Sequence, residues 1–396
     1  MGAKNNKNIK EEKVEESKIP QPFFQQSNKI SNEECMSFEI YQLKNINNAF
    51  YIATISENKG IIIYKCLFSK QEFKEILTIK TSFLYDSKIQ IKYFCNPRNG
   101  EEYLFIVKEY KYIEIYLIKS EKMYILINKK EIEIDNYYAK TLIEKIDIIY
   151  NTYEDRIYVI ISFIIKENYI PKRIILYEFN DKLDEYLHEI KIIKLNKYEA
   201  ANIIYEDKKL KKYYIIIIGT NARLIEITNN SLNESGNLIE IEDELKKLNI
   251  VLNMKNNNKA CFVNTYNNDE FLYIFYKENI LINGVFKENK TILVIIDMLK
   301  RKAKDIISLN NSFTIYSIAN WKNNYIILAS KNFIYIFDIR INKIISKYKN
   351  FFRDNESIEL VRPFFIENKF YGLFILFSRL TYLLTSEKKK FMKFIK

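Results

Sequence analysis

The sequence predicts an all-β fold built from repeated antiparallel units. From residue 37 onward, runs of about five to nine residues rich in Ile, Tyr, Phe and Val alternate with clusters of Asn, Asp, Lys or Glu, which is the pattern of strands and turns. Helical periodicity is nearly absent, and only short stretches such as 239–248 alternate Glu and Lys with Ile and Leu. With 396 residues, 48% of them hydrophobic, the chain can bury a core for one large domain or two medium ones.

The clearest internal repeat lies late in the chain. Residues 291–298 align with 332–339, and each segment is a strand-like run that reaches an aspartate, Asp297 or Asp338, before a basic turn and a second run. Two further runs, 313–318 and 324–330, precede the second copy. Residues 313–349 therefore predict a four-stranded antiparallel unit, which is one blade of a β-propeller.

This unit resembles the WD40-repeat family. Residues 325–330 look like the second strand of a repeat and 333–340 like the third, with Phe337-Asp338 where the family has Trp-Asp. The resemblance implies that Asp297 and Asp338 each accept hydrogen bonds from N–H groups of the following turn.

The chain also departs from the family pattern. It contains no Gly-His dipeptide, its one histidine is His188, and its one tryptophan, Trp321, does not precede an aspartate. The Asp-His-Ser-Trp hydrogen-bond network of regular blades therefore cannot form. Blade cohesion is expected to come from buried Ile, Tyr and Phe instead.

Counting third strands predicts seven blades. The candidate third strands are 61–68, 112–118, 173–179, 222–228, 291–297, 333–339 and 379–385. The gap between the fourth and the fifth is too long for one blade, so an insertion within 230–289, either a helix at 240–248 or an extra hairpin, is expected. We therefore expect a seven-bladed WD40-like β-propeller over residues 35–396, with tandem β-sandwiches as the alternative.

Residues 1–34 are predicted to form a disordered N-terminal arm. They mix Lys and Glu with Asn and Gln, and Phe23 and Phe24 are their only aromatic side chains, so they bury little apolar area. Two closures of the ring remain open: residues 37–43 pair with the last blade, or residues 391–395 do.

Composition argues against catalysis. One histidine excludes any site that needs two, and none of the seven glycines belongs to a Gly-x-Ser-x-Gly, P-loop or dinucleotide motif. The cysteines stand 29 or more residues apart, too far for the close pairs of a zinc site; they are Cys35, Cys66, Cys95 and Cys261. We expect no enzyme activity, no metal and no cofactor. Since no apolar stretch is long enough to span a bilayer, a cytoplasmic or nuclear location is predicted.

The net charge of +12 is concentrated in the last quarter of the chain. Residues 299–396 hold 19 Lys and Arg against seven Asp and Glu, whereas the first 298 residues hold 43 of each. The candidate basic patch consists of Lys300, Arg301, Lys302, Lys304, Lys388, Lys389 and Lys390. An acidic partner would meet this quarter, although lysines on an exposed edge strand also prevent edge-to-edge association.

These observations predict a non-catalytic scaffold that binds other proteins, including proteins with acidic surfaces, within a multiprotein complex. The residues expected to define the repeat are Asp297, Phe337, Asp338 and Arg340. One alternative is a nucleic-acid-associated propeller subunit that uses the basic quarter, but no stacking platform stands beside the basic residues. The other is a ubiquitin-ligase substrate receptor, because residues 337–340 approximate the Trp-Asp-x-Arg string of such propellers.

Overall fold

The fold is known from a computed structural model. It describes residues 11–12, 26–29, 37–46, 49–56, 59–67, 73–81, 89–108, 112–132, 141–165, 173–183, 185–196, 199–229, 237–250, 259–264, 270–282, 285–309, 315–321, 325–331, 333–349, 358–366, 369–377 and 380–385.

The described strands form seven sheets, which we number in chain order. Sheet one contains β3 (Ser37–Tyr41), β4 (Ala49–Ser56), β5 (Gly60–Leu67) and β6 (Phe73–Ile79). Sheet two contains β7 (Gln90–Cys95), β8 (Glu102–Lys108), β9 (Tyr112–Ser120) and β10 (Met123–Glu131). Sheet three contains β11 (Thr141–Asn151), β12 (Arg156–Ile165), β13 (Arg173–Phe179) and β14 (Leu187–Lys194). Sheet four contains β15 (Ala200–Asp207), β16 (Lys212–Ile218), β17 (Ala222–Glu226) and β18 (Asn237–Ile239).

The last three sheets follow the same order. Sheet five contains β19 (Lys259–Asn264), β20 (Glu270–Ile282), β21 (Val285–Asp297) and β22 (Lys302–Leu309), with the short β1 (Glu11–Glu12) added parallel to β22. Sheet six contains β23 (Ser317–Trp321), β24 (Tyr325–Ala329), β25 (Phe333–Asp338) and β26 (Lys343–Lys349). Sheet seven contains β27 (Ile358–Ile366), β28 (Lys369–Phe377), β29 (Leu380–Thr385) and β2 (Gln26–Lys29).

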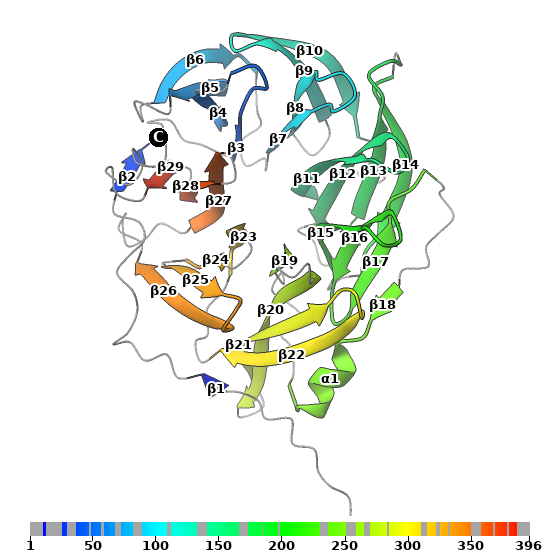
Figure 1. Cartoon of the computed structure of the whole chain (residues 1–396), viewed down its shortest axis with the longest axis vertical. Coiled ribbons are helices and arrows are strands. Elements are labelled where there is room, and N and C mark those ends of the chain that lie inside the picture. Colours follow the sequence, from blue (N-terminus) through cyan, green and yellow to red (C-terminus); the bar gives the residue numbers. More distant parts are fainter. Residues whose placement is uncertain are drawn as a thin grey trace, which may run out of the picture.

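The sheets stand around a ring, as Figure 1 shows. The first strand of each sheet is innermost, since first strands of successive sheets contact one another at β3–β7, β7–β11, β15–β19, β19–β23 and β23–β27. The chain then runs outward strand by strand through antiparallel pairs before it crosses to the next sheet. The fold is an all-β propeller.

Most predicted strands are confirmed. Each of the seven candidate third strands overlaps the third strand of a sheet: β5, β9, β13, β17, β21, β25 and β29. The first strand of sheet six was predicted too early, because the strand is Ser317–Trp321 rather than 313–318. Within 230–289 a helix is present, α1 (Glu242–Lys247), but β19 and β20 of sheet five occupy much of the rest.

The N-terminal arm and the closure of the ring differ from the prediction. Gln26–Lys29 pairs antiparallel with β29 as the outermost strand of sheet seven, so these arm residues are ordered in a strand. Residues 37–41 do not pair with the last sheet but with β4 in sheet one. The alternative closure by 391–395 lies outside the described residues. A strand from the N-terminal arm thus completes the sheet formed by the C-terminal strands.

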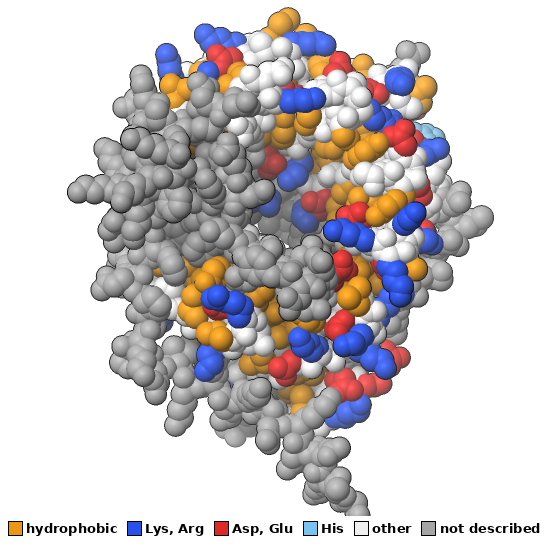
Figure 2. Space-filling view, viewed as in Figure 1, with side chains coloured by type: hydrophobic (Ala, Val, Ile, Leu, Met, Phe, Trp, Pro, Cys, Tyr) orange, Lys and Arg blue, Asp and Glu red, His pale blue; other side chains and the backbone are white. Residues whose placement is uncertain are grey.

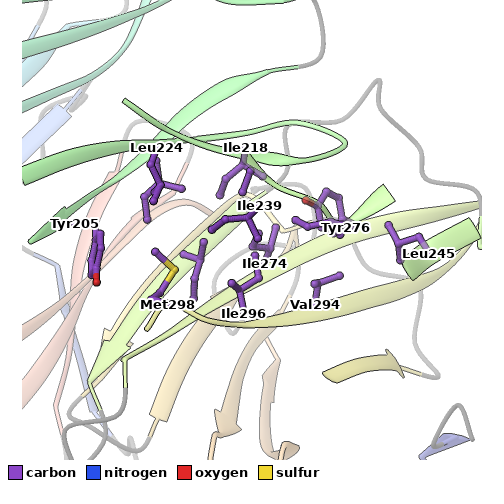
Figure 3. Close-up of a cluster of buried hydrophobic side chains, with 14 of the residues drawn as sticks. Tyr205, Ile218, Leu224, Ile239, Leu245, Ile274, Tyr276, Val294, Ile296 and Met298 are labelled. Carbon is purple, nitrogen blue, oxygen red and sulfur yellow. The ribbon is translucent and has the colours of Figure 1, made fainter. Parts of the chain in front are cut away.

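Adjacent sheets cohere through aliphatic and aromatic side chains. Figure 3 shows one such cluster, in which Ile218, Leu224 and Ile239 of sheet four lie against Ile274, Val294 and Ile296 of sheet five. A middle strand is covered by a neighbouring sheet on each side, so runs such as residues 214–218 of β16 are buried throughout. Full burial stabilises each such Ile by about 1.5–3 kcal/mol.

The Asn221 side chain accepts hydrogen bonds from the first backbone N–H groups of the helix α1. The Asn221 Oδ1 atom accepts hydrogen bonds from the N–H groups of Ile241 and Glu242, at 2.8 and 2.9 Å. The buried Leu245 side chain then packs into the cluster between sheets four and five. None of the helices that the structure describes is both long enough and apolar enough to cross a membrane.

Candidate interaction face

The turns of the sheets fall on two opposite faces of the ring. In sheets one to six, four consecutive strands form an antiparallel meander that begins at the ring centre, so the turns between the first and second and between the third and fourth strands lie at the same end. Since each chain crossing joins an outermost strand to the next innermost one, this end is the same for all sheets. We call it the hairpin face.

Five turns of the hairpin face share one backbone design. Each has an Asn or Asp at the end of a strand whose side-chain oxygen accepts a hydrogen bond from a turn N–H, and a residue with positive φ four positions later. The five pairs are Asn96 and Gly100, Asn151 and Asp155, Asp207 and Lys211, Asp297 and Arg301, and Asp338 and Asn342. The short polar side chain fixes the start of the turn and the left-handed residue reverses the chain.

The prediction that Asp297 and Asp338 accept turn N–H groups is confirmed. The Lys300 backbone N–H donates to Asp297 Oδ1 at 3.0 Å, and the Arg340 backbone N–H donates to Asp338 Oδ1 at 2.9 Å. The sequence also predicts a tight turn at residues 96–100 and a charged loop tip at Glu206-Asp207, but the design that the turns at Asn96, Asn151 and Asp207 share with these two was not recognised. A usable signal existed, because in four of the five turns an Arg or Lys follows the Asn or Asp by five positions, and these residues are Arg156, Lys212, Lys302 and Lys343.

Asp338 is the most strongly bonded carboxylate among these turns. It is 3% exposed, and besides the backbone N–H it binds the Arg340 guanidinium, with Nε 3.0 Å from Oδ1 and Nη2 2.5 Å from Oδ2. Burial acts to raise the pKa of Asp338, but the bonds from Arg340 outweigh it and hold that pKa below its ordinary value. Phe337 is fully buried against Tyr273 and Phe275 of sheet five.

Arg340 closes its own turn. Its Nη2 atom also donates to the Tyr325 hydroxyl at 3.0 Å, and its guanidinium lies 5.4 Å from the centre of the Tyr325 ring. The bonds to Asp338 raise the pKa of Arg340 further, so it stays charged. The guanidinium is therefore engaged within sheet six.

The structure brings four residues of the candidate basic patch together at the turn between β21 and β22. Lys300 lies 3.2 Å from Asp297, and Arg301 Nη2 lies 3.6 Å from Asp207 Oδ2 in the neighbouring sheet. Lys302 is exposed, and Lys304 Nζ lies 3.9 Å from the centre of the Phe271 ring. Lys388, Lys389 and Lys390 lie outside the described residues.

A second basic turn stands beside this one. The turn between β15 and β16 holds Lys208, Lys209 and Lys211, all exposed. The contact from Arg301 to Asp207 joins it to the β21–β22 turn. The distribution of charge along the chain does not predict this second basic turn, because the two turns meet only in the folded protein.

Polar contacts tie the turns of sheets two, three and four to one another. Arg98 Nε lies 2.9 Å from Asp155 Oδ1, and Asn96 Nδ2 donates to Asp181 Oδ2 at 2.9 Å. The Tyr153 hydroxyl donates to Glu206 at 2.8 Å, which raises the pKa of Tyr153 to about 12. These bonds fix the relative positions of neighbouring turns in this part of the hairpin face.

Charged side chains also gather around the central opening of the ring, as Figure 2 shows. On the innermost strands, Lys92 Nζ lies 3.1 Å from Glu39 Oε1, and Lys145 Nζ lies 2.7 Å from Asp147 Oδ2. The described part of the chain contains no group of three or more His, Cys, Asp and Glu residues that could hold a metal ion. His188 is exposed on β14, the outermost strand of sheet three.

Comparison with known proteins shows the fold. The ring superimposes on the crystal structure of Chaetomium thermophilum Raptor with a TM-score of 0.56 at 9% identity, over 91% of this chain and 29% of that one. It matches the C-terminal WD40 domain of Sif2 with a TM-score of 0.50 at 7% identity, over 92% of this chain and 99% of that one. The chain folds as a WD40-like β-propeller.

A further match to this WD40-like propeller is BBS1N, crystallised in complex with ARL6DN. Its TM-score is 0.53 at 10% identity, over 92% of this chain and 97% of that one. No family model matches the sequence, and no curated protein matches it. The present chain spans less than a third of the Raptor chain.

Proposed function

We propose that this WD40-like propeller is a non-catalytic scaffold with seven blades, one for each sheet, that binds other proteins within a complex. The observation that carries the proposal is the hairpin face, where turns of successive sheets are held in place by side chains of their neighbours. A preorganised surface loses little conformational entropy when a partner binds. The similar fold of BBS1N was crystallised with a protein partner, which supports a protein as the ligand class here.

The side chains that anchor three turns of the hairpin face are bonded to neighbouring groups. Asp338 is bonded to Arg340, Asp297 to Lys300, and Asn96 to both a turn N–H and Asp181. A general acid or base needs a free position beside a substrate, and these side chains instead hold turns. This supports a binding role over a catalytic one.

The ligase-receptor alternative depends on Arg340. Its guanidinium already binds Asp338 and Tyr325, so engagement of a receptor partner would compete with bonds that close the turn. The scaffold proposal does not require any of these bonds to break, and we therefore prefer it.

Purification of the tagged full-length chain, followed by gel filtration after nuclease treatment, tests the scaffold function. We expect at least one protein to co-elute at a fixed ratio. A variant with Lys182→Glu and Leu183→Asp, both exposed in the β13–β14 turn, should lose that protein. The control is Lys74→Glu with Leu126→Asp, exposed on the outermost strands β6 and β10, and it should retain the protein.

Two results would contradict the proposal. If the chain elutes alone, or only with RNA when nuclease is omitted, then it is not a protein scaffold. If the Lys182 and Leu183 variant and its control retain the partner equally, then this part of the hairpin face does not bind it.

A further inference from the structure

Three consecutive sheets expose an aliphatic side chain at the tip of a turn on the hairpin face. Leu210 is 48% exposed between β15 and β16, Leu299 is 59% exposed between β21 and β22, and Ile341 is 54% exposed between β25 and β26. Each tip follows the anchoring aspartate of its turn by two or three positions. Scattered exposed apolar residues are ordinary, but their recurrence in turns of one face in three consecutive sheets calls for a common explanation.

Basic side chains flank every tip. Lys208, Lys209 and Lys211 surround Leu210, Lys300 and Arg301 follow Leu299, and Arg340 precedes Ile341. The aspartates of these turns stand at the strand ends below the tips, and they are half-buried or buried: Asp207, Asp297 and Asp338. The outward surface of the three turns is therefore aliphatic at its tips and positive around them.

The three tips share one side of the molecule. Turns between first and second and between third and fourth strands all lie on the hairpin face, and the Arg301 to Asp207 contact brings the Leu210 and Leu299 turns together. Adjacent sheets carry the tips, so all three lie on neighbouring parts of the same face.

We propose that the turns carrying Leu210, Leu299 and Ile341 dock on an anionic lipid bilayer. Aliphatic side chains that project from separate turns can each enter the interface between headgroups and acyl chains. The exposed lysines of the first two turns bind anionic headgroups, and these are Lys208, Lys209, Lys211 and Lys302. The bilayer is fluid, so it accommodates projections that are spaced apart.

The other ligand classes fit the same surface less well. The core of a protein interface is apolar and depleted of charge, whereas here every tip has a basic residue next to it in the chain. Single-stranded nucleic acid is bound by planar side chains on which bases stack, and these tips are aliphatic. The proposal does not rest on the scaffold function. Both use the β15–β16 turn of sheet four, but the scaffold test changes only the β13–β14 turn of sheet three.

Flotation of the full-length protein with vesicles tests this assignment. Vesicles of phosphatidylcholine are compared with vesicles that also contain about 30% phosphatidylserine. We expect binding to the anionic vesicles to be about ten-fold tighter than to the neutral ones, and to weaken as salt is added.

Two variants separate the contributions of tips and charges. Leu210→Ser, Leu299→Ser and Ile341→Ser together should reduce the vesicle affinity about ten-fold, and so should Lys208→Gln, Lys209→Gln, Lys300→Gln and Lys302→Gln. The matched controls, Leu126→Ser for the tips and Lys74→Gln with Lys194→Gln for the charges, lie on outermost strands and should bind like the wild type. All variants must first melt at the wild-type temperature.

Absence of vesicle binding by the wild type would overturn the proposal. Equal loss in the tip variant and its Leu126→Ser control would overturn it as well. RNA binding that falls in the charge variant but not in the tip variant, without vesicle binding, would assign the surface to nucleic acid. The tip variant is also purified from an extract cleared of membranes. If it still retains the co-purified protein, then loss of vesicle binding is distinct from loss of the scaffold function.

Discussion

Asp338 illustrates how one side chain holds a turn of the propeller. Its carboxylate accepts a backbone N–H and two guanidinium bonds while almost wholly buried. Asp338→Ala should lower the free energy of unfolding by about 1–3 kcal/mol, because the turn loses its hydrogen bonds to a buried carboxylate. Chemical denaturation measures this, with the exposed Asp243→Ala as a control that should change it little. Equal losses in the two variants would contradict the assigned role.

The same carboxylate should contribute to acid sensitivity. Since its pKa in the folded protein lies below the ordinary value, its stabilisation is complete above the ordinary aspartate pKa of about 3.9 and is lost as the pH falls through the lower folded-state pKa. The difference in unfolding free energy between the wild type and Asp338→Asn should therefore shrink as the pH is lowered through this range. A difference that stays constant or grows with acidification would contradict this linkage.

Two glycines with positive φ allow the cost of backbone strain to be compared with the cost of a steric clash at an added Cβ. A Cβ at Gly60, where φ is +91°, would lie 2.4 Å from the Ile79 carbonyl oxygen, whereas a Cβ at Gly100, where φ is +75°, would meet only the Lys44 ammonium at 2.6 Å. A lysine end moves easily and a strand carbonyl does not. Gly60→Ala should therefore cost about 3 kcal/mol and Gly100→Ala about 1 kcal/mol, as measured by denaturation. Equal costs would show that φ alone governs both sites.

At the scale of the element, the shared turn design places long side chains in the left-handed region. Lys211 has a φ of 55° between β15 and β16, a conformation that glycine adopts without the steric cost of a Cβ. Lys211→Gly should therefore raise the melting temperature by about 1–2 °C. Lys208→Gly in the same turn, where φ is negative, should lower it instead. If Lys211→Gly and Lys208→Gly both lower the melting temperature, then this explanation is wrong.

At the scale of the whole molecule, β2 joins the N-terminal arm to the C-terminal strands. Its four residues pair with β29, so deletion of residues 1–34 should lower the unfolding free energy by about 1–3 kcal/mol through lost strand hydrogen bonds. Deletion of residues 1–24 keeps β2 and serves as the control. Thermal melting of the two truncations compares them. If both truncations melt together, then β2 does not stabilise the ring.

The sequence by itself determined the local features of this propeller. Alternation of apolar runs with Asn, Asp and Lys clusters located the third strands, because strand pairing along a meander depends on neighbours in the chain. The match between Asp297 and Asp338 likewise followed from local spacing, since an Asx side chain bonds N–H groups two or three residues away.

Only the tertiary structure decided the features that join distant segments. The sequence placed Gln26–Lys29 in a disordered arm, because four polar residues carry no apolar pattern, yet the open edge of β29 supplies their hydrogen bonds. The meeting of Arg301 with Asp207, and with it the grouping of Leu210 and Leu299 on one face, depends on how two sheets stand around the ring. The spacing of residues along the chain does not predict that arrangement, because the packing of one sheet on the next determines it.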